Sequence, residues 1–275
     1  MARRQETLSA QPAFSWRMWR IAGVTVFTAA TAVGLAASLV KVEEFVIEDR
    51  RFALPPPREA GAPSPGLRLE GVKQTPVVDI AAVFRQDYGR SLYLCPIAER
   101  RRLLLAIDWV REASVSRIWP NRLVVRIEER TPVAFVRLQD GAAPRAALID
   151  ADGVLLRLPA RFSARLPVLT GIQSTQSEAE RRERVQLFLR ASRDLGPAMD
   201  AISEVDVADP ANLKLLRQQD GRLITLLVGA EDFRRRLERF ARGYAAIQAR
   251  HPQASVFDLR VPGEIIVSEY AGAVR

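Results

Sequence analysis

The hydrophobic pattern is dominated at its start by an uncharged run at residues 21–40, IAGVTVFTAATAVGLAASLV. As an α-helix that rises 1.5 Å per residue, this run is about 30 Å long, the thickness of the hydrocarbon core of a bilayer. Its only polar side chains are those of Thr and Ser, so it lacks the polar stripe of a helix on a soluble domain. We predict one membrane-spanning helix over 21–40.

The charges that flank this run differ between its two sides. Arginines outnumber acids before it, whereas one lysine and two acids follow it. The residues concerned are Arg3, Arg4, Glu6, Arg17, Arg20, Lys41, Glu43 and Glu44. The positive-inside rule then predicts a cytoplasmic tail over 1–20 and an extracytoplasmic chain from Lys41 onward. A cleavable signal peptide is the alternative, because Ala36-Ala37-Ser38 are small, but its apolar region spans only about 7–15 residues.

The pattern after the span predicts a first extracytoplasmic domain over 41–130. A short, partly alternating segment at 45–52 leads into a proline-rich insertion at 55–66, which must be a loop because proline lacks the N–H of a ladder. Alternation and helical spacing then predict a strand, two helices and a hairpin of two strands, at 67–72, 79–88, 99–107, 110–115 and 123–127. This order gives a small sheet with two helices on one face. Its expected inner face comprises Leu69, Ile80, Leu103, Val110, Val115, Leu123 and Val125.

A strand-rich second domain is predicted over 131–268, followed by a tail at 269–275. Its expected strands lie at 133–138, 147–149, 154–156, 202–207, 213–217, 223–228, 256–259 and 265–267. Helical spacing predicts one helix at 178–195 and another from Phe233 to Ile247. The fold class is therefore α+β.

Composition excludes several functions. The chain has 275 residues, with 41 Lys plus Arg against 32 Asp plus Glu and a net charge of +9. The positive charges are nearly all arginine, spread along the chain among acids, and aromatic residues make up only 7%, so we expect no nucleic-acid binding. The single cysteine (Cys95) and single histidine (His251) cannot form a zinc site or an intrachain disulfide, and we expect no metal and no cofactor. His251 precedes a proline in a polar turn, where a surface residue is expected.

Catalytic motifs are also missing or incomplete in the sequence. The sequence contains no phosphate-binding loop, no dinucleotide-binding glycine pattern and no nucleophile elbow. Ser38 and Lys41 have the spacing of a serine–lysine pair, but they sit at the end of the span without companion motifs. Asp150 and Asp152 suit a turn better than acid–base catalysis. We predict a protein that is not an enzyme and has no small-molecule substrate.

Residues 107–134, IDWVREASVSRIWPNRLVVRIEERTPVA, carry a recognisable signature. The run resembles the POTRA domain of FtsQ/DivIB bacterial cell-division proteins, whose pattern is matched here by Trp109, Val110, Arg117, Trp119 and Pro120. The similarity extends to LIDADG at 148–153, LPVLTG at 166–171, DFRRRLERF at 232–240 and DLR at 258–260. The order of a short tail, one span, a POTRA domain and a strand-rich domain is also similar.

The resemblance implies a scaffold of the divisome in the cytoplasmic (inner) membrane, enriched at the division septum. It implies two bitopic partners, FtsB and FtsL, together with other early and late division proteins. In the family, FtsB binds the last strand as an open edge and the helix before it. The corresponding residues here are Val261, Gly263, Glu264, Ile265, Ile266 and Val267 on the edge, and Arg235, Arg239 and Arg242 on the helix.

The physical basis expected for this binding is strand addition, because an edge strand offers unpaired N–H and C=O groups to a partner strand. The arginines could meet acids of a partner helix, or they could simply be the solvated face of an amphipathic helix. Trp119 is expected to pack at its hairpin turn rather than to recognise a partner. The alternative function is a POTRA-bearing envelope protein that acts in secretion or outer-membrane assembly, and a cell-wall hydrolase is a distant third.

Overall fold

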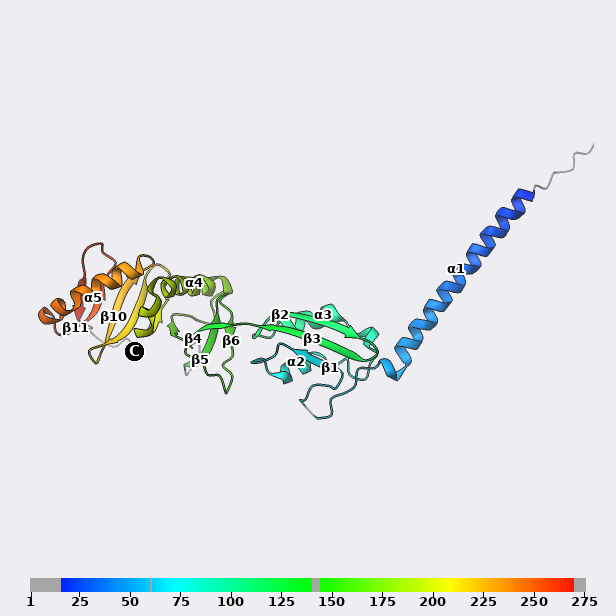
Figure 1. Ribbon diagram of the computed structural model, residues 1–275, viewed down its shortest axis with the longest axis horizontal. Helices are drawn as coiled ribbons and strands as arrows, with labels where there is room; N and C mark the ends of the chain where they lie inside the picture. Colours follow the sequence, from blue (N-terminus) through cyan, green and yellow to red (C-terminus); the bar gives the residue numbers. More distant parts are fainter. Residues whose placement is uncertain (1–15, 60, 140–143, 270–275) are drawn as a thin grey trace, which may run out of the picture.

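The computed structural model describes residues 16–59, 61–139 and 144–269. Residues 1–15 of the predicted cytoplasmic tail and residues 270–275 of the predicted C-terminal tail lie outside the described residues. Along the described chain, a long helix precedes a small three-stranded sheet and then a nine-stranded sheet, each sheet with two helices (Figure 1). The predicted α+β fold class is confirmed.

Helix α1 runs from Trp16 to Glu48, beyond the predicted end at residue 40. Lysine and glutamate are good helix formers, and no Gly or Pro interrupts 41–48, so the helix continues. The segment expected to alternate at 45–52 is instead the last turn of α1 followed by the 3₁₀ turn η1, Arg50–Phe52. Gly23–Glu48 is long and apolar enough to cross a membrane, with a mean hydropathy of 1.8, and no other helix of the described chain is.

The first sheet has the predicted order of elements. They are β1 (Leu67–Glu70), α2 (Val77–Val83), the 3₁₀ turn η2 (Leu92–Leu94), α3 (Ile97–Leu105), β2 (Val110–Ile118) and β3 (Arg122–Glu129). Strand β3 is central, parallel to β1 and antiparallel to β2. The described part of the proline-rich segment 55–66 forms no helix or strand, as predicted. The Ser64 hydroxyl donates a hydrogen bond to the carbonyl of Pro55 and so connects the two ends of the segment.

The core of this domain lies between the sheet and its two helices. Leu123, Val125 and Ile127 alternate along β3, so they share one face and are buried against Ile80 and Leu104. The prediction of Leu103 as a core residue is wrong, because its side chain is 43% exposed. Arg100 and Leu104, four residues apart, form the inner stripe of α3 instead.

The second sheet has the strand order β12-β11-β10-β9-β8-β7-β4-β5-β6. Its elements are β4 (Pro132–Leu138), β5 (Arg145–Asp150), β6 (Leu155–Leu156), β7 (Val168–Thr170), α4 (Glu178–Leu195), the 3₁₀ helix η3 (Gly196–Ala201), β8 (Ile202–Asp206), β9 (Leu213–Gln219), β10 (Arg222–Gly229), α5 (Phe233–Arg250), β11 (Ala254–Asp258) and β12 (Ile266–Glu269). The predicted strands and helices are present. Sequence analysis missed β7, which is only three residues long.

Both helices of this domain are crossover connections. Strands β7 and β8 are parallel and joined by α4, and β10 and β11 are parallel and joined by α5. A parallel pair needs such a connection across a face of the sheet. The two helices contact each other, since the backbone N–H of Arg234 donates to Asp194 at 2.8 Å, and both bury side chains in one core. The face under α4 and α5 is therefore covered, and the edge at β12 ends the sheet.

Candidate protein-binding edge

Strand β12 forms one end of the nine-stranded sheet. It pairs antiparallel with β11, and no strand of residues 16–59, 61–139 and 144–269 pairs with its outer side. Ile265 and Val267, two residues apart, pack against the core, whereas Ile266 between them is 51% exposed. The strand is thus held by its inner side chains while its outer backbone groups are open for pairing.

The edge starts later in the chain than expected. Val261, Gly263 and Glu264 lie in the connection between β11 and β12, so only Ile266 and Val267 of the predicted edge residues are on the strand and Ile265 directly precedes it. Pro262 cannot donate, Gly263 has a φ of +82°, and the N–H of Glu264 donates to the carbonyl of Val261, as in a type II turn. The turn places these three residues beside the edge rather than along it.

The arginines of α5 that were expected to contact a partner lie on the side of the helix opposite its buried face. Arg235, Arg239 and Arg242 are spaced i, i+4 and i+7, which aligns them on one stripe. Arg235 and Arg242 are exposed, and no acid of the described chain pairs with either. Arg239 is different, because its Nη2 donates to the carbonyls of Leu259 and Val261 at 2.6 and 3.1 Å. Arg239 therefore fixes the turn that leads into β12.

The motif Asp258-Leu259-Arg260 stabilises the end of β11. The Arg260 guanidinium donates to both carboxylate oxygens of Asp258, at 2.9 and 2.6 Å, and to Asn212 at 2.7 Å. The hydrogen bonds from Arg260 lower the pKa of Asp258, and burial opposes them only in part. The pair stays charged and anchors the backbone directly before the turn.

Some residues of the POTRA motif are buried, and others lie at the surface. Trp109 and Val110 are buried, and Arg117 donates from Nε to the carbonyl of Leu92 at 2.9 Å. Pro120 lies in the turn between β2 and β3. Trp119, in the same turn, packs edge-on against Phe52 with ring centroids 5.7 Å apart, and it remains half exposed.

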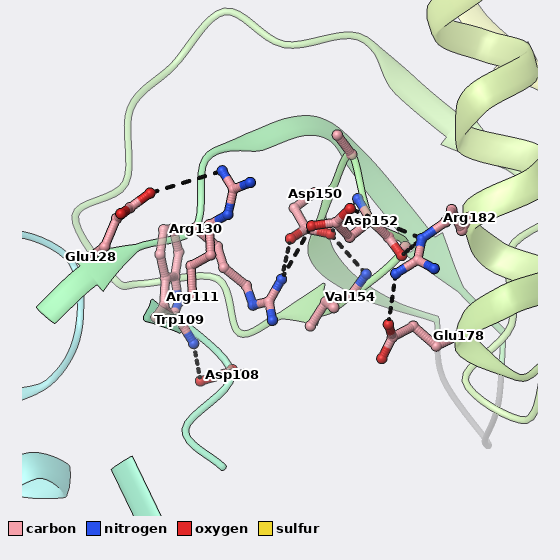
Figure 2. A network of polar contacts seen from close by, with 12 residues as sticks. Asp108, Trp109, Arg111, Glu128, Arg130, Asp150, Asp152, Val154, Glu178 and Arg182 are labelled. Carbon is pink, nitrogen blue, oxygen red and sulfur yellow. Dashed lines mark hydrogen bonds and ion pairs between the residues drawn. The ribbon is translucent and has the colours of Figure 1, made fainter. Parts of the chain in front are cut away.

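The contact between the two domains was not predicted from the sequence. The Trp109 ring is buried with Leu148 and Leu156 of the second domain, and its Nε1 donates to the carbonyl of Arg157 at 2.9 Å. Figure 2 shows Arg130, between the two sheets, directed at Asp150, which it meets at 2.7 Å. The other oxygen of Asp150 accepts from the N–H groups of Asp152 and Val154, so this carboxylate also makes the predicted turn. The available signal in the sequence was Trp109, a large apolar residue directly before β2 of the first domain.

The remaining residues singled out in the sequence do not gather at a site. Cys95 is buried, and desolvation raises the pKa of its thiol to about 11. The Ser38 hydroxyl donates to the carbonyl of Gly34 within α1 at 2.8 Å. His251 is exposed at the end of α5. No cluster of metal-ligating side chains occurs in the part of the chain that the structure describes.

An apolar N-terminal helix, a βααββ unit and a mixed sheet with an open edge define a POTRA-bearing, single-pass membrane protein. The family model "POTRA domain, FtsQ-type" matches residues 67–130. Cell division protein FtsQ of Koribacter versatilis is 27% identical over 196 residues, which cover 69% of this chain and 55% of that protein. The FtsQ proteins of Geotalea daltonii and Novosphingobium aromaticivorans are 26% and 27% identical over 209 and 241 residues, covering 73% and 87% of this chain and 72% and 68% of those proteins.

These similarities confirm the resemblance to the FtsQ/DivIB family and support a cell division protein of the FtsQ type. The chain spans little more than half of the Koribacter versatilis protein, 55% of its length.

Proposed function

We propose that the protein is a non-enzymatic scaffold of the bacterial division complex, anchored by α1 in the cytoplasmic membrane with its N-terminus in the cytoplasm and enriched at the septum. It links early and late division proteins by binding FtsB-like and FtsL-like bitopic partners. The similarity to FtsQ proteins supports the role in division. The distribution of charges around residues 21–40 supports the orientation.

The observation that carries the proposed binding mode is the outer side of β12, with which no strand of the described residues pairs. A partner strand gains affinity there from main-chain hydrogen bonds and specificity from alternate side chains, of which Ile266 is the exposed one. Val261, Gly263 and Glu264 shape the turn beside the added strand. Arg235 and Arg242 meet acids on a partner helix, each worth about 1 kcal/mol or less unless it is desolvated.

The test is the position of a fluorescent fusion to the cytoplasmic N-terminus in dividing cells. The full chain is compared with a chain that ends at Arg260 and with the full chain carrying Arg239→Gln. We expect a septal band for all three, and loss of FtsB-like and FtsL-like partners from midcell with the truncated chain. Arg239→Gln keeps β12 but weakens the hold on its turn, so it should give an intermediate loss.

A uniform membrane signal from an intact fusion, in cells that divide normally without the protein, would contradict the division role. It would favour the alternative of a POTRA-bearing protein in secretion or outer-membrane assembly. Partner recruitment by the truncated chain at the level of the full chain would contradict the edge-strand mode alone.

A further inference from the structure

Apolar side chains that remain partly exposed gather where α1 meets the first domain. They are Phe45, Phe52, Tyr93, Leu94, Ile118 and Trp119, referred to here as the junction patch. All but Phe52 are between 44 and 50% exposed. Aromatic rings connect them, because Phe52 contacts Phe45 of α1 on one side at 5.8 Å and Trp119 of the β2–β3 turn on the other at 5.7 Å, both edge-on.

The patch is fixed to the end of α1 and cannot swing freely. The Ser91 hydroxyl donates to the carbonyl of Val46 in the last turns of α1 at 2.7 Å, and Ser91 directly precedes η2, which carries Tyr93 and Leu94. Arg117 ties η2 to the end of β2 near Ile118. In Figure 1 the end of the first domain that contains the β2–β3 turn is the end next to α1.

The depth of the patch follows from the length of the helix. Phe45 is five residues beyond Val40, the last residue of the uncharged run, which corresponds to about 7.5 Å along the axis. The polar layer on each side of a bilayer core is about 5–7.5 Å thick. A span that ends near Val40 therefore brings Phe45, the start of the patch, to the outer boundary of the lipid headgroup layer.

We propose that the junction patch rests on the phospholipid headgroup layer of the membrane that α1 spans, and so orients the first domain against the bilayer. Tryptophan and tyrosine favour this layer because one end of the ring is apolar and the other polar. A hollow of about 450 Å³ lined by Phe45, Arg51, Phe52, Pro120 and Asn121 lies in the patch. The Arg51 guanidinium there is paired with the Asp49 carboxylate at 2.7 Å and lies over the Phe45 ring, so the hollow offers the headgroup layer a mixed apolar and polar surface. The proposal requires that α1 spans the membrane but not that β12 binds a partner.

The test uses the full chain in phospholipid nanodiscs with a spin label at one introduced cysteine. Cys95 is buried, so the label reports the new site. Asn121→Cys probes the patch, Ala211→Cys the exposed surface of the second domain, and Ala30→Cys the insertion of α1. We expect the label at 121 to be open to oxygen from the lipid and shielded from a water-soluble nickel chelate, unlike the label at 211.

Trp119→Ser should return the label at 121 toward the accessibility of the label at 211. The matched control is Leu223→Ser, which removes an apolar side chain 59% exposed on β10 and should leave the label at 121 unchanged. A label at 121 as water-accessible as that at 211, while the label at 30 is inserted, would overturn the proposal and leave the anchor intact. Shielding that appears only with two chains per disc would also overturn it, in favour of a contact between copies.

Discussion

At the scale of single residues, the first domain depends on charges buried inside it. Arg100 donates from Nε and Nη2 to the two carboxylate oxygens of Asp87, at 2.6 and 3.1 Å, and both side chains are nearly inaccessible. Neither could be recognised in the sequence, where arginines occur throughout and charge alone does not distinguish a buried one. A buried pair of this kind holds α3 in register with the chain that follows α2.

Removal of one partner of this pair should be costly, because the other charge stays buried. We expect Arg100→Ala to lower the free energy of unfolding by about 3–5 kcal/mol, measured by urea denaturation of the full chain in detergent. The double variant Arg100→Met with Asp87→Leu should recover most of that loss. A loss of less than about 1 kcal/mol for Arg100→Ala would contradict the assigned role.

Glu129 gives the first domain a dependence on pH. Its carboxylate accepts hydrogen bonds from the backbone N–H groups of Lys73, Gln74 and Thr75 and from the Thr75 hydroxyl, at 2.7 to 3.0 Å. Burial alone would raise its pKa, but these hydrogen bonds outweigh it and hold the pKa below the usual 4.5. A carboxyl whose pKa is lower in the folded state adds stability above its unfolded pKa, and this stability is lost as the pH falls through the folded value.

Glu129→Gln should therefore destabilise the protein by about 1–3 kcal/mol at neutral pH. The difference from the natural protein should shrink as the pH falls below about 4.5, the ordinary glutamate value. Thermal unfolding across this pH range provides the measurement, with Glu128→Gln, an exposed neighbour, as the control that changes little. A difference between Glu129→Gln and the natural protein that stayed constant with pH would show that the carboxylate charge is not responsible.

At the scale of elements, the alternation of apolar residues was a reliable guide where strands were long. The helices α4 and α5 were predicted because five side chains in each repeat at helical spacing, and the hairpin of β2 and β3 because two apolar segments flank a turn at Pro120 and Asn121. Strand β7 was missed because three residues cannot show a period. The pattern predicted the last strand at 265–267, within one residue of the start of β12. Val261, Gly263 and Glu264 were assigned to the edge by the resemblance alone, and they lie in the connection that contains the Pro262-Gly263 turn.

Proline in β12 should abolish strand addition. Successive N–H groups of an edge strand point alternately inward and outward, so one of Ile266 and Val267 offers its N–H to a partner. We expect Ile266→Pro or Val267→Pro to weaken binding of an FtsB-like partner by about tenfold or more, through loss of that bond and clash of the ring. The controls Ile266→Ala and Val267→Ala keep the N–H, and circular dichroism checks the fold. Equal binding by both proline variants and their alanine controls would exclude main-chain pairing at β12.

At the scale of the whole molecule, the contacts around Trp109 couple the domain of the three-stranded sheet to that of the nine-stranded sheet. Trp109 follows α3 in the first domain, yet only 2% of it is exposed because Leu148 and Leu156 of the second domain cover it. Arg157 adds ion pairs to Asp79 at 2.6 Å and Asp108 at 3.2 Å. The sequence could not predict this coupling, because the contacts join residues that are far apart along the chain, such as Trp109 and Arg157, which are 48 positions apart.

Trp109→Ala should cost about 3–5 kcal/mol and divide unfolding of the two domains into two transitions. Scanning calorimetry of the full chain measures both effects. Trp119→Ala, which removes the half-exposed tryptophan of the same domain, should leave a single transition. If Trp109→Ala unfolds in a single transition at the midpoint temperature of the natural protein, the domains are coupled elsewhere.

The central claim is that the outer side of β12 pairs with a partner strand. Amide hydrogen exchange of the full chain in nanodiscs, with and without the extracytoplasmic segment of an FtsB-like partner, tests it most directly. We predict slower exchange at 266–269 on binding, with no change at β6, the opposite end of the sheet. Binding that leaves the exchange of 266–269 unchanged and slows that of another surface would contradict the claim.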